Sequence, residues 1–295
     1  MSKNFISGVD LLEKCRIYRK KIWEIMLERE IENTGKSKAE IFNDMKKNLI
    51  VMKAAVKDGL YEDIKSVSGL VGGDAKRLRK RYEKERTVSG KRMNKAVASA
   101  MAVLEVNASM GQIVAAPTAG SSGIIPGALI TVGEDFNFND DDLVKALFTA
   151  AAIGYIITRN ATVSGAEGGC QAETGAAAAM AASAIVELLG GSPEQALHAA
   201  SMTIKNILGL VCDPIAGLVE SPCVKRNAIG TANAFISADM ALAGIKSIIP
   251  FDEVVEAMYK VGRSLPCELR ETAQGGLAKT PTGIKIEEEI FNKKQ

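Results

Sequence analysis

Residues 176–182 read Ala-Ala-Ala-Ala-Met-Ala-Ala, and this run decides the fold class. Alanine has the highest intrinsic helix propensity of all residues, and its short side chain lets neighbouring backbones approach closely. The run lies within residues 174–189, which we predict to form one helix. Such a helix is typical of the centre of a compact helical core.

The same texture extends outward from this run, because the last two thirds of the chain are rich in Ala and Gly and poor in charge. Helical patterns recur at residues 141–158, 193–208, 225–245 and 252–263, and several open with the Asp, Ser or Pro that favours a helix start. Alternation typical of strands is scarce. The sequence therefore predicts an all-α fold with a compact Ala/Gly-rich core, and short β elements are the main alternative.

Two amphipathic patterns fill the first third of the chain. The first predicts a single helix with one apolar stripe, formed by Leu11, Cys15, Tyr18, Ile22 and Ile25. The second predicts another helix, with Ser37 as N-cap, Gly59 near its end, and an apolar stripe formed by Phe42, Met45, Leu49, Met52 and Val56. Residues 1–87 thus form a predicted N-terminal helical arm, packed on the core or on a partner, and residues 88–295 form the core.

The composition excludes several classes of protein. With 295 residues, 47% of them hydrophobic, the chain can bury one sizeable core. No stretch approaches the roughly 18 apolar residues of a membrane helix, and the N-terminus lacks the apolar block of a signal peptide, so we expect a cytoplasmic protein without membrane contact. Five cysteines are an odd number for a disulfide framework, which favours reduced thiols, free or bound to metal.

The net charge of +2 hides an asymmetry along the chain. Residues 1–92 carry 23 Lys and Arg against 14 Asp and Glu, whereas the remainder carries 14 against 21. A basic arm of this kind suits nucleic acid or an anionic surface. The basic residues are nevertheless interleaved with acidic ones along helical faces, which is typical of a solvated surface. We therefore expect no nucleic-acid partner.

One loop-like segment has the composition of an anion site. Residues 116–127 read Ala-Pro-Thr-Ala-Gly-Ser-Ser-Gly-Ile-Ile-Pro-Gly. The glycines permit a tight turn in which successive N–H groups point inward, and Thr118, Ser121 and Ser122 add hydroxyl donors ahead of a predicted helix. Together with Gly123 they suit a carboxylate or a phosphate. A capped turn without a ligand is an equal alternative, and the segment matches neither the P-loop nor the dinucleotide-binding fingerprint.

Three cysteines lie in two further segments that resemble loops, residues 164–175 and 211–223. Gly or Pro residues flank Cys170, Cys212 and Cys223 and free the backbone to curl around a ligand. The spacings of 42 and 11 residues are not the Cys-x-x-Cys of zinc sites or ferredoxins. Spacing alone therefore leaves two interpretations open, metal binding and burial as small apolar residues. Cys15, on its helical stripe, is expected in the core.

A fourth segment, residues 265–278, reads Leu-Pro-Cys-Glu-Leu-Arg-Glu-Thr-Ala-Gln-Gly-Gly-Leu-Ala. In this order the four segments resemble the α chain of iron–sulfur L-serine dehydratases, from about residue 18 to residue 284. The resemblance implies that Cys170, Cys212 and Cys223 hold a [4Fe–4S] cluster, that L-serine binds beside it, and that the product is pyruvate with ammonia. In such a site we expect the Ser/Gly loop, residues 118–123, to hold the substrate carboxylate.

The implied cofactor suits the chemistry. Hydroxide is a poor leaving group, so removal of water needs a Lewis acid at the departing oxygen, and three cysteine ligands leave one iron with an open position. A general base must also take the Cα proton. The sequence does not identify this base, and the candidates without a signature are His198, Lys91, Lys205 and Lys279.

Several other polar residues lie in or near these segments. Glu167 and Glu173 flank Cys170 and suit either support of the cluster site or an ordinary surface. Asn160, Arg226 and Asn227 receive no assigned role. Cys267 is a candidate fourth cluster ligand, because single-chain relatives use a cysteine near the C-terminus and residues 290–295 contain none.

Three other functions compete with this interpretation. A pyridoxal-phosphate dehydratase would use the Ser/Gly loop for the cofactor phosphate, but it leaves the three cysteines unexplained. A non-enzymatic electron carrier would hold a fully ligated cluster. A related lyase would act on L-cysteine or another small amino acid. Enzymes of the resembled family also pair the α domain with a β domain, which we expect here on a separate subunit.

Overall fold

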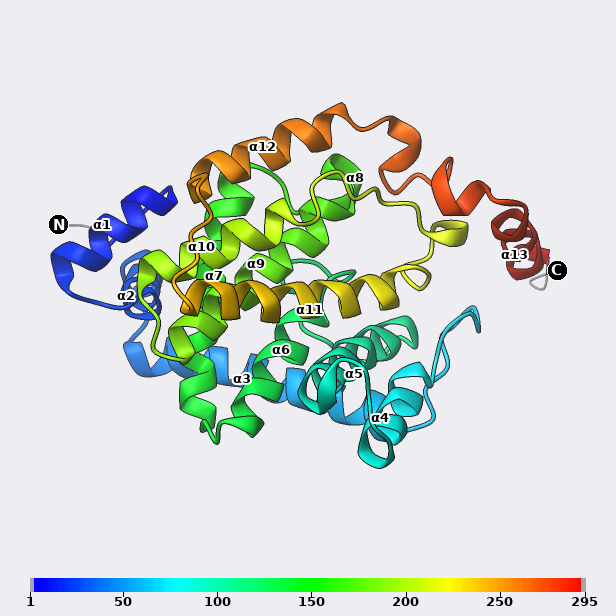
Figure 1. Cartoon of the computed structure of the whole chain (residues 1–295), viewed down its shortest axis with the longest axis horizontal. Coiled ribbons are helices and arrows are strands. Elements are labelled where there is room, and N and C mark those ends of the chain that lie inside the picture. The colour runs from blue at the N-terminus through cyan, green and yellow to red at the C-terminus, as the bar shows by residue number, and fades with distance from the viewer. Residues whose placement is uncertain (1–2, 293–295) are drawn as a thin grey trace.

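The computed structural model describes residues 3–292 and is helical throughout. Its α-helices run in chain order as follows (Figure 1): α1 Gly8–Tyr18, α2 Ile22–Thr34, α3 Lys38–Tyr61, α4 Asp74–Lys84, α5 Gly90–Ala108, α6 Ile124–Asp135, α7 Asp140–Asn160, α8 Gly165–Gly168, α9 Cys170–Leu188, α10 Pro193–Lys205, α11 Cys223–Leu242, α12 Phe251–Ser264 and α13 Pro281–Asn292. Between these lie short 3₁₀ turns η1 Ile215–Gly217, η2 Cys267–Leu269 and η3 Gly276–Lys279. The described residues contain no strand, and the predicted all-α class is confirmed.

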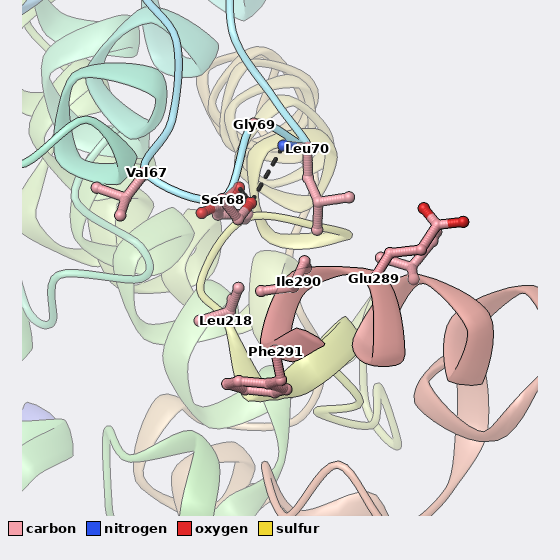
Figure 2. A pocket seen from close by; sticks show the side chains of 10 residues that line it. Val67, Ser68, Gly69, Leu70, Leu218, Glu289, Ile290 and Phe291 are labelled. Atoms are coloured by element: carbon pink, nitrogen blue, oxygen red, sulfur yellow. Dashed lines mark hydrogen bonds between the residues drawn. The ribbon is translucent and has the colours of Figure 1, made fainter. Parts of the chain in front are cut away.

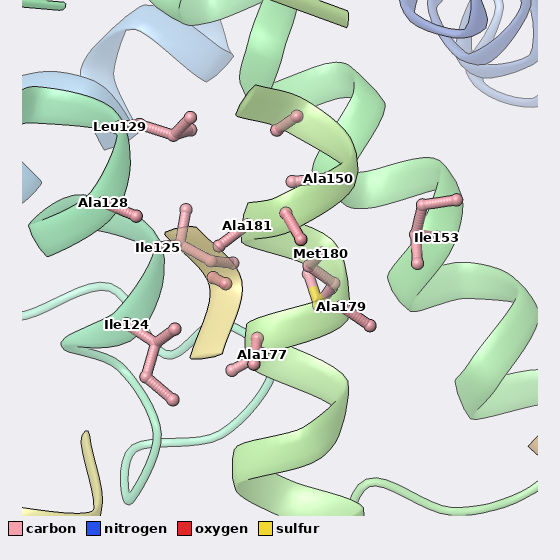
Figure 3. Packing of buried hydrophobic residues seen from close by; sticks show 14 of the residues in the cluster. Ile124, Ile125, Ala128, Leu129, Ala150, Ile153, Ala177, Ala179, Met180 and Ala181 are labelled. Carbon is pink, nitrogen blue, oxygen red and sulfur yellow. The ribbon is translucent and has the colours of Figure 1, made fainter. Parts of the chain in front are cut away.

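The alanine run lies at the centre of this fold. Helix α9 packs against α6, α7, α10 and α11, and every alanine of the run is 0% exposed. In Figure 3, Ile124 and Ile125 of α6 lie on one side of α9 and Ile153 of α7 lies on the other. A Cβ added at Gly154 of α7 would lie 2.7 Å from the Cε of Met180. Small residues therefore set the spacing between these helices, as the composition predicted.

The N-terminal helices pack on the same core. Helix α2 contacts α7, and α3 contacts both α5 and α7. Cys15, Ile25 and Leu49 belong to the buried cluster that includes the alanines of α9, so the expected burial of Cys15 is confirmed. Ser37 caps α3 as predicted and accepts a hydrogen bond from the N–H of Glu40. The division of the chain near residue 88 stays a prediction.

The predicted single helix through residues 11–25 is wrong. Helix α1 ends at Tyr18, because Arg19 has a φ of 51° and adopts the left-handed conformation that closes a helix. Helix α2 then begins at Ile22. The residues of the predicted stripe Leu11, Cys15, Ile22 and Ile25 are nevertheless buried. Two short helices thus present the apolar surface that the periodicity assigned to one.

Two buried glutamates of the core cap helices at the periphery. Glu187 of α9 accepts hydrogen bonds from the N–H groups of Ile22 (2.7 Å) and Trp23 (3.1 Å) at the start of α2. Glu105 of α5 likewise accepts from the N–H groups at the start of α4. A carboxylate at a helix N-terminus satisfies free amides and complements the helix dipole. Within residues 3–292, no helix combines the length and apolar character needed to cross a membrane.

Candidate active site

Backbone hydrogen bonds bring the cysteine segments together. The N–H of Gln171, beside Cys170, donates to the carbonyl oxygen of Leu210 at 3.0 Å. Cys212 donates its N–H to Leu269 (2.8 Å) and accepts from the N–H of Glu271 (2.6 Å). Leu269 and Glu271 of the segment 265–278 are therefore both hydrogen-bonded to the backbone of Cys212. Two of the motifs are thus joined to the Cys212 segment by main-chain contacts.

Two of the three cysteines begin helices and do not lie in loops as the sequence suggested. Cys170 is the first residue of α9, and Cys223 is the first residue of α11. Only Cys212 lies in irregular chain, where it forms an isolated bridge with Arg270. The positive end of a helix dipole favours a thiolate, so the starts of α9 and α11 suit cysteines that bind metal.

The three thiols are buried and lie within electrostatic range of one another. Cys170 and Cys212 are 3% exposed and Cys223 is 7% exposed, and none of them forms a disulfide bond. Burial raises the pKa of all three thiols, to about 12 for Cys223, and the other cysteines raise the pKa of Cys212 further. Coordination to a metal would deprotonate these thiols despite their raised pKa values.

Among residues 3–292, no group of three His, Cys, Asp or Glu side chains is arranged around a single metal ion. The cysteine set does not need such an arrangement, because each thiolate of a cluster binds a different iron atom. Three reduced, buried thiols beside one partly buried cation are the donor chemistry that an iron–sulfur cluster requires. The residues present therefore fit the cluster that the sequence implies.

Arg226 is that partly buried cation. Its Nη1 donates to the carbonyl oxygen of Val211 at 2.8 Å, and its Nη2 donates to the carboxylate of Asp213 at 2.7 Å. The other oxygen of Asp213 accepts the N–H of Leu277 at 2.8 Å. The positive charge also lowers the pKa of the Cys170 thiol, although burial has the larger effect and raises it.

The Ser/Gly loop reaches the same region through Glu173. Thr118 donates its hydroxyl proton to Oε1 of Glu173, and the hydroxyl oxygens of Thr118 and Ser121 are 2.9 Å apart. Ser122 donates to the carbonyl oxygen of Ala119 at 2.7 Å. A Cβ added at Gly120 would lie 2.6 Å from Oε1 of Glu173, so the loop backbone lies directly against this carboxylate.

The loop keeps free amide groups as well as hydroxyls. The N–H of Gly123 donates to Oδ1 of Asn227 at 3.1 Å, whereas the N–H groups of Ala119, Gly120 and Ser121 have no acceptor among the described residues. Gly120 and Ser121 are buried, so their two amides need a partner other than bulk water, whereas Ala119 is exposed. The three amides just before α6 suit a carboxylate.

The two glutamates beside Cys170 have different surroundings. Glu167 is exposed, whereas Glu173 is partly buried, and the desolvation of its carboxyl group raises the pKa of that group. A Cβ added at Gly165 would lie 3.5 Å from Oε2 of Glu173, 3.0 Å from Oε2 of Glu271 and 3.0 Å from Sγ of Cys212. Glu173 and Glu271 therefore face one small region beside a cysteine. Glu271 could not be singled out from the sequence, because no local motif distinguishes it.

The candidate bases make their described contacts elsewhere. His198 of α10 accepts from the N–H of Ser247 at 3.4 Å, and burial lowers the pKa of its imidazole. Lys205 donates to the carbonyl oxygen of Ser247, and Lys279 lies 3.6 Å from Glu287. Lys91 is exposed. None of these contacts involves a cysteine or the Ser/Gly loop.

The remaining candidates lie at the surface. Cys267 is exposed in η2, and the side-chain amide of Asn160 donates to the carbonyl oxygen of Ile6.

A cavity of 450 Å³ lies beside the connection from Cys212 to Cys223 (Figure 2). It is lined by Leu218 and Glu220 of this connection, by residues 67–70, and by α13. Ser68 donates to the buried carboxylate of Glu220 at its edge.

Comparison with known proteins gives a consistent result. The sequence model described as "Serine dehydratase alpha chain" matches residues 18–278. The chain is 53% identical to a probable L-serine dehydratase alpha chain of Bacillus subtilis, over 96% of this chain and 94% of the relative. It is 49% identical to the L-serine dehydratase alpha chain of Peptoniphilus asaccharolyticus, over 96% and 97%.

A longer relative is the L-serine dehydratase of Streptomyces coelicolor, which is 37% identical over 93% of this chain but only 60% of its own length. All four motifs lie within the matched family region, and the last of them, residues 265–278, ends where that region ends. The chain therefore belongs to the serine dehydratase alpha chain family.

Proposed function

We propose that this chain is the catalytic α chain of an L-serine dehydratase that converts L-serine to pyruvate and ammonia in the cytoplasm. Membership of the family supports the reaction. The observation that carries the proposal for the site is the meeting of three buried cysteines with a Ser/Gly loop in which the N–H groups of Ala119, Gly120 and Ser121 have no acceptor among the described residues. Both parts contact residues of α9 and α11.

Cys170, Cys212 and Cys223 would hold a [4Fe–4S] cluster, with Arg226 as the neighbouring cation. When bound, the cluster supplies a Lewis acid that weakens the bond between Cβ and the hydroxyl group of serine. The fourth ligand of the cluster would be the substrate, water, a residue of a partner chain or Cys267, which is exposed.

The Ser/Gly loop would bind the substrate carboxylate. The free N–H groups of Ala119, Gly120 and Ser121 are donors with fixed positions, because residues before and after them are hydrogen-bonded. The hydroxyls of Thr118 and Ser122 already donate within the protein, so backbone amides provide most of the contact. Ser121 and Gly123 complete the loop. A carboxylate held here fixes the direction of the Cα–H bond relative to the leaving hydroxyl.

Elimination then breaks the Cα–H and Cβ–O bonds and forms a double bond between Cα and Cβ. A base takes the Cα proton, and the hydroxyl group leaves as water. The resulting enamine tautomerises to an imine, which water hydrolyses to pyruvate and ammonium. The described contacts of His198, Lys205 and Lys279 place none of them at the loop, so we assign the base to a separate β chain.

An anaerobic assay of pyruvate release tests this proposal. The α chain is reconstituted with iron and sulfide, combined with its β chain, and supplied in turn with L-serine, L-threonine, D-serine and L-cysteine. L-Serine should give the highest kcat/KM. Faster turnover of L-cysteine would assign the chain to a related lyase, and a reconstituted complex without any lyase activity would leave electron transfer as its function.

A further inference from the structure

Two adjacent side chains at the start of α11 contact different parts of the candidate site. Arg226 and Asn227 follow Cys223 by three and four residues, within the first turns of the helix. Neither carries a sequence signature. Arg226 contacts the Cys212 segment, whereas Asn227 contacts the Ser/Gly loop, which lies far away in the sequence.

Arg226 holds the Cys212 segment on both sides of the cysteine. One nitrogen of its guanidinium group donates to the carbonyl oxygen of Val211, and another donates to the carboxylate of Asp213. The side chains of Arg226 and Asp213 are only 14% and 4% exposed. Because the planar guanidinium group fixes both donors at once, it sets the position of Cys212 relative to Cys223. Lysine offers only one point of contact and cannot reproduce this geometry.

Asn227 holds the Ser/Gly loop. Its Oδ1 accepts the N–H of Gly123 at 3.1 Å, and its Nδ2 donates to the carbonyl oxygen of Gly120 at 2.7 Å and to that of Cys223 at 3.0 Å. The residue is 0% exposed. Its amide therefore joins the loop to the first turn of α11 by fixing Gly120, the middle residue of the three with free amides, and Gly123 at the end of the loop. Asn227 makes no described contact with Val211 or Asp213.

We infer that Arg226 and Asn227 are positioning residues with separate tasks: Arg226 sets the Cys212 ligand for the cluster, and Asn227 sets the Ser/Gly loop for the substrate. The inference rests on the proposed function. It goes beyond it by assigning cluster retention and substrate affinity to neighbouring residues on one helical turn. A general packing role for this turn would affect both properties together.

The test compares variants of the reconstituted αβ complex by two measurements. The first is the rate at which a chelator removes iron under anaerobic conditions, followed by visible absorbance. The second is the pair of constants kcat and KM for L-serine. Arg226→Gln should release iron about tenfold faster than the wild type, the usual cost of losing a residue that orients a metal ligand, and Arg226→Lys should restore little of this loss.

Asn227→Ala should raise KM for L-serine about tenfold, with a smaller change in kcat, and should release iron at the wild-type rate. Asn227→Asp keeps the acceptor for Gly123 and loses both donors, so it provides a nearly isosteric second variant if the alanine variant does not fold. Lys225→Gln, at an exposed site on the same turn, and Thr231→Val, at a buried site one turn later, are the controls.

Equal acceleration of iron release by the Arg226 and Asn227 variants would overturn the inference, since it would show one structural role. Unchanged KM in both Asn227 variants would also overturn it. Failure of the proposed function gives a different result, because the wild-type complex would then not convert L-serine. In that case the iron measurement still tests the role of Arg226, and the effect of L-serine on the cluster absorbance tests that of Asn227.

Discussion

At the scale of single residues, surroundings distinguish Cys170 and Cys223, which lie near Arg226, from the other two buried cysteines, Cys15 and Cys212. All four are buried, and burial raises the pKa of Cys15 to about 12. The charged groups near Cys15 are carboxylates, which raise the pKa of its thiol further. Cys170, in contrast, lies 3.0 Å from the hydroxyl oxygen of Thr174 and near Arg226, and both groups favour the thiolate. Burial alone would not separate these two kinds of cysteine.

Replacing any one of Cys170, Cys212 and Cys223 with serine should abolish the cluster. Each supplies a thiolate that no neighbour replaces, so we expect pyruvate release to fall more than about 100-fold. Iron per chain after anaerobic reconstitution is the measurement, and Cys15→Ser is the control that should keep both iron and activity. Wild-type iron content in all three variants would refute the ligand assignment.

Thr118→Ala should weaken the binding of L-serine without loss of iron. The hydroxyl of Thr118 joins Ser121 to Glu173, and its removal frees the loop that presents the amides. We expect KM for L-serine to rise about tenfold, which corresponds to one lost hydrogen bond. Thr118→Ser keeps the hydroxyl and should behave as the wild type. An unchanged KM in the alanine variant would exclude a role for this hydroxyl in substrate affinity.

Local sequence identified the cysteines and the Ser/Gly loop but not the residues that connect them. Cysteine, glycine and serine carry their chemistry or their conformational freedom wherever they occur. The role of Asn227 arises from contact with Gly120, which lies 107 positions away in the chain. Glu271 likewise lies beside Cys212 because its N–H donates to the carbonyl oxygen of that residue. Such roles depend on tertiary packing, which periodicity and composition do not specify.

At the scale of helices, the sequence predicted which helices exist better than it predicted where each helix begins and ends. Helices α7, α10 and α12 lie within a few residues of their predicted ranges. The starts of α9 and α11 were placed too late, because their N-caps, Gly169 and Pro222, make no side-chain cap hydrogen bond. Cys170 and Cys223 are the first residues of α9 and α11. The boundary error therefore concealed that two proposed ligands occupy helix N-termini.

Removal of the Glu187 cap should destabilise the fold. This carboxylate receives two backbone amides of α2 and the hydroxyl of Thr149, and Glu187→Ala leaves all three without their acceptor. We expect the free energy of unfolding to fall by about 2 kcal/mol in anaerobic chemical denaturation. Glu194→Ala, an exposed change in the first turn of α10, is the control and should have little effect.

The same carboxyl group should make stability depend on pH. Burial raises the pKa of Glu187 above its ordinary value of 4.5, so the folded state holds this proton more tightly than the unfolded state. Its contribution is full below pH 4.5 and is lost as the pH rises through the folded-state pKa. The variant Glu187→Gln lacks this proton and should show a smaller fall in stability over that range. Identical slopes in both proteins would contradict the assignment.

Helix α13 should protect the cluster more than it stabilises the fold. Gly283 is the one buried residue of α13, and this helix packs mainly against the short 3₁₀ turns η1 and η3. Together with residues 67–70 it covers Leu218 and Glu220, between two proposed ligands (Figure 2). A chain that ends at Thr280 should keep its helical circular dichroism but lose iron faster in air. The exposed substitution Lys285→Ala is the control, and equal rates of iron loss would exclude this role.

At the scale of the whole molecule, the candidate site is built from one chain's ligands and binding loop but lacks an assigned base. The two α-chain relatives match over 94% and 97% of their lengths, whereas the longer relative of Streptomyces coelicolor matches over 60%. We propose that the additional length of that relative corresponds to a β chain. We therefore expect the base to come from a second subunit.

The dependence on a β chain can be measured directly. The α chain is purified anaerobically, reconstituted with iron and sulfide, and assayed for pyruvate release with and without its β chain. We expect activity at least about 100-fold lower without the partner, because general-base catalysis contributes at least that much. Iron content should be the same in both samples, so the difference reports the base and not the cluster. Full activity of the isolated chain, with no complex by size-exclusion chromatography at micromolar concentration, would place the base on the α chain.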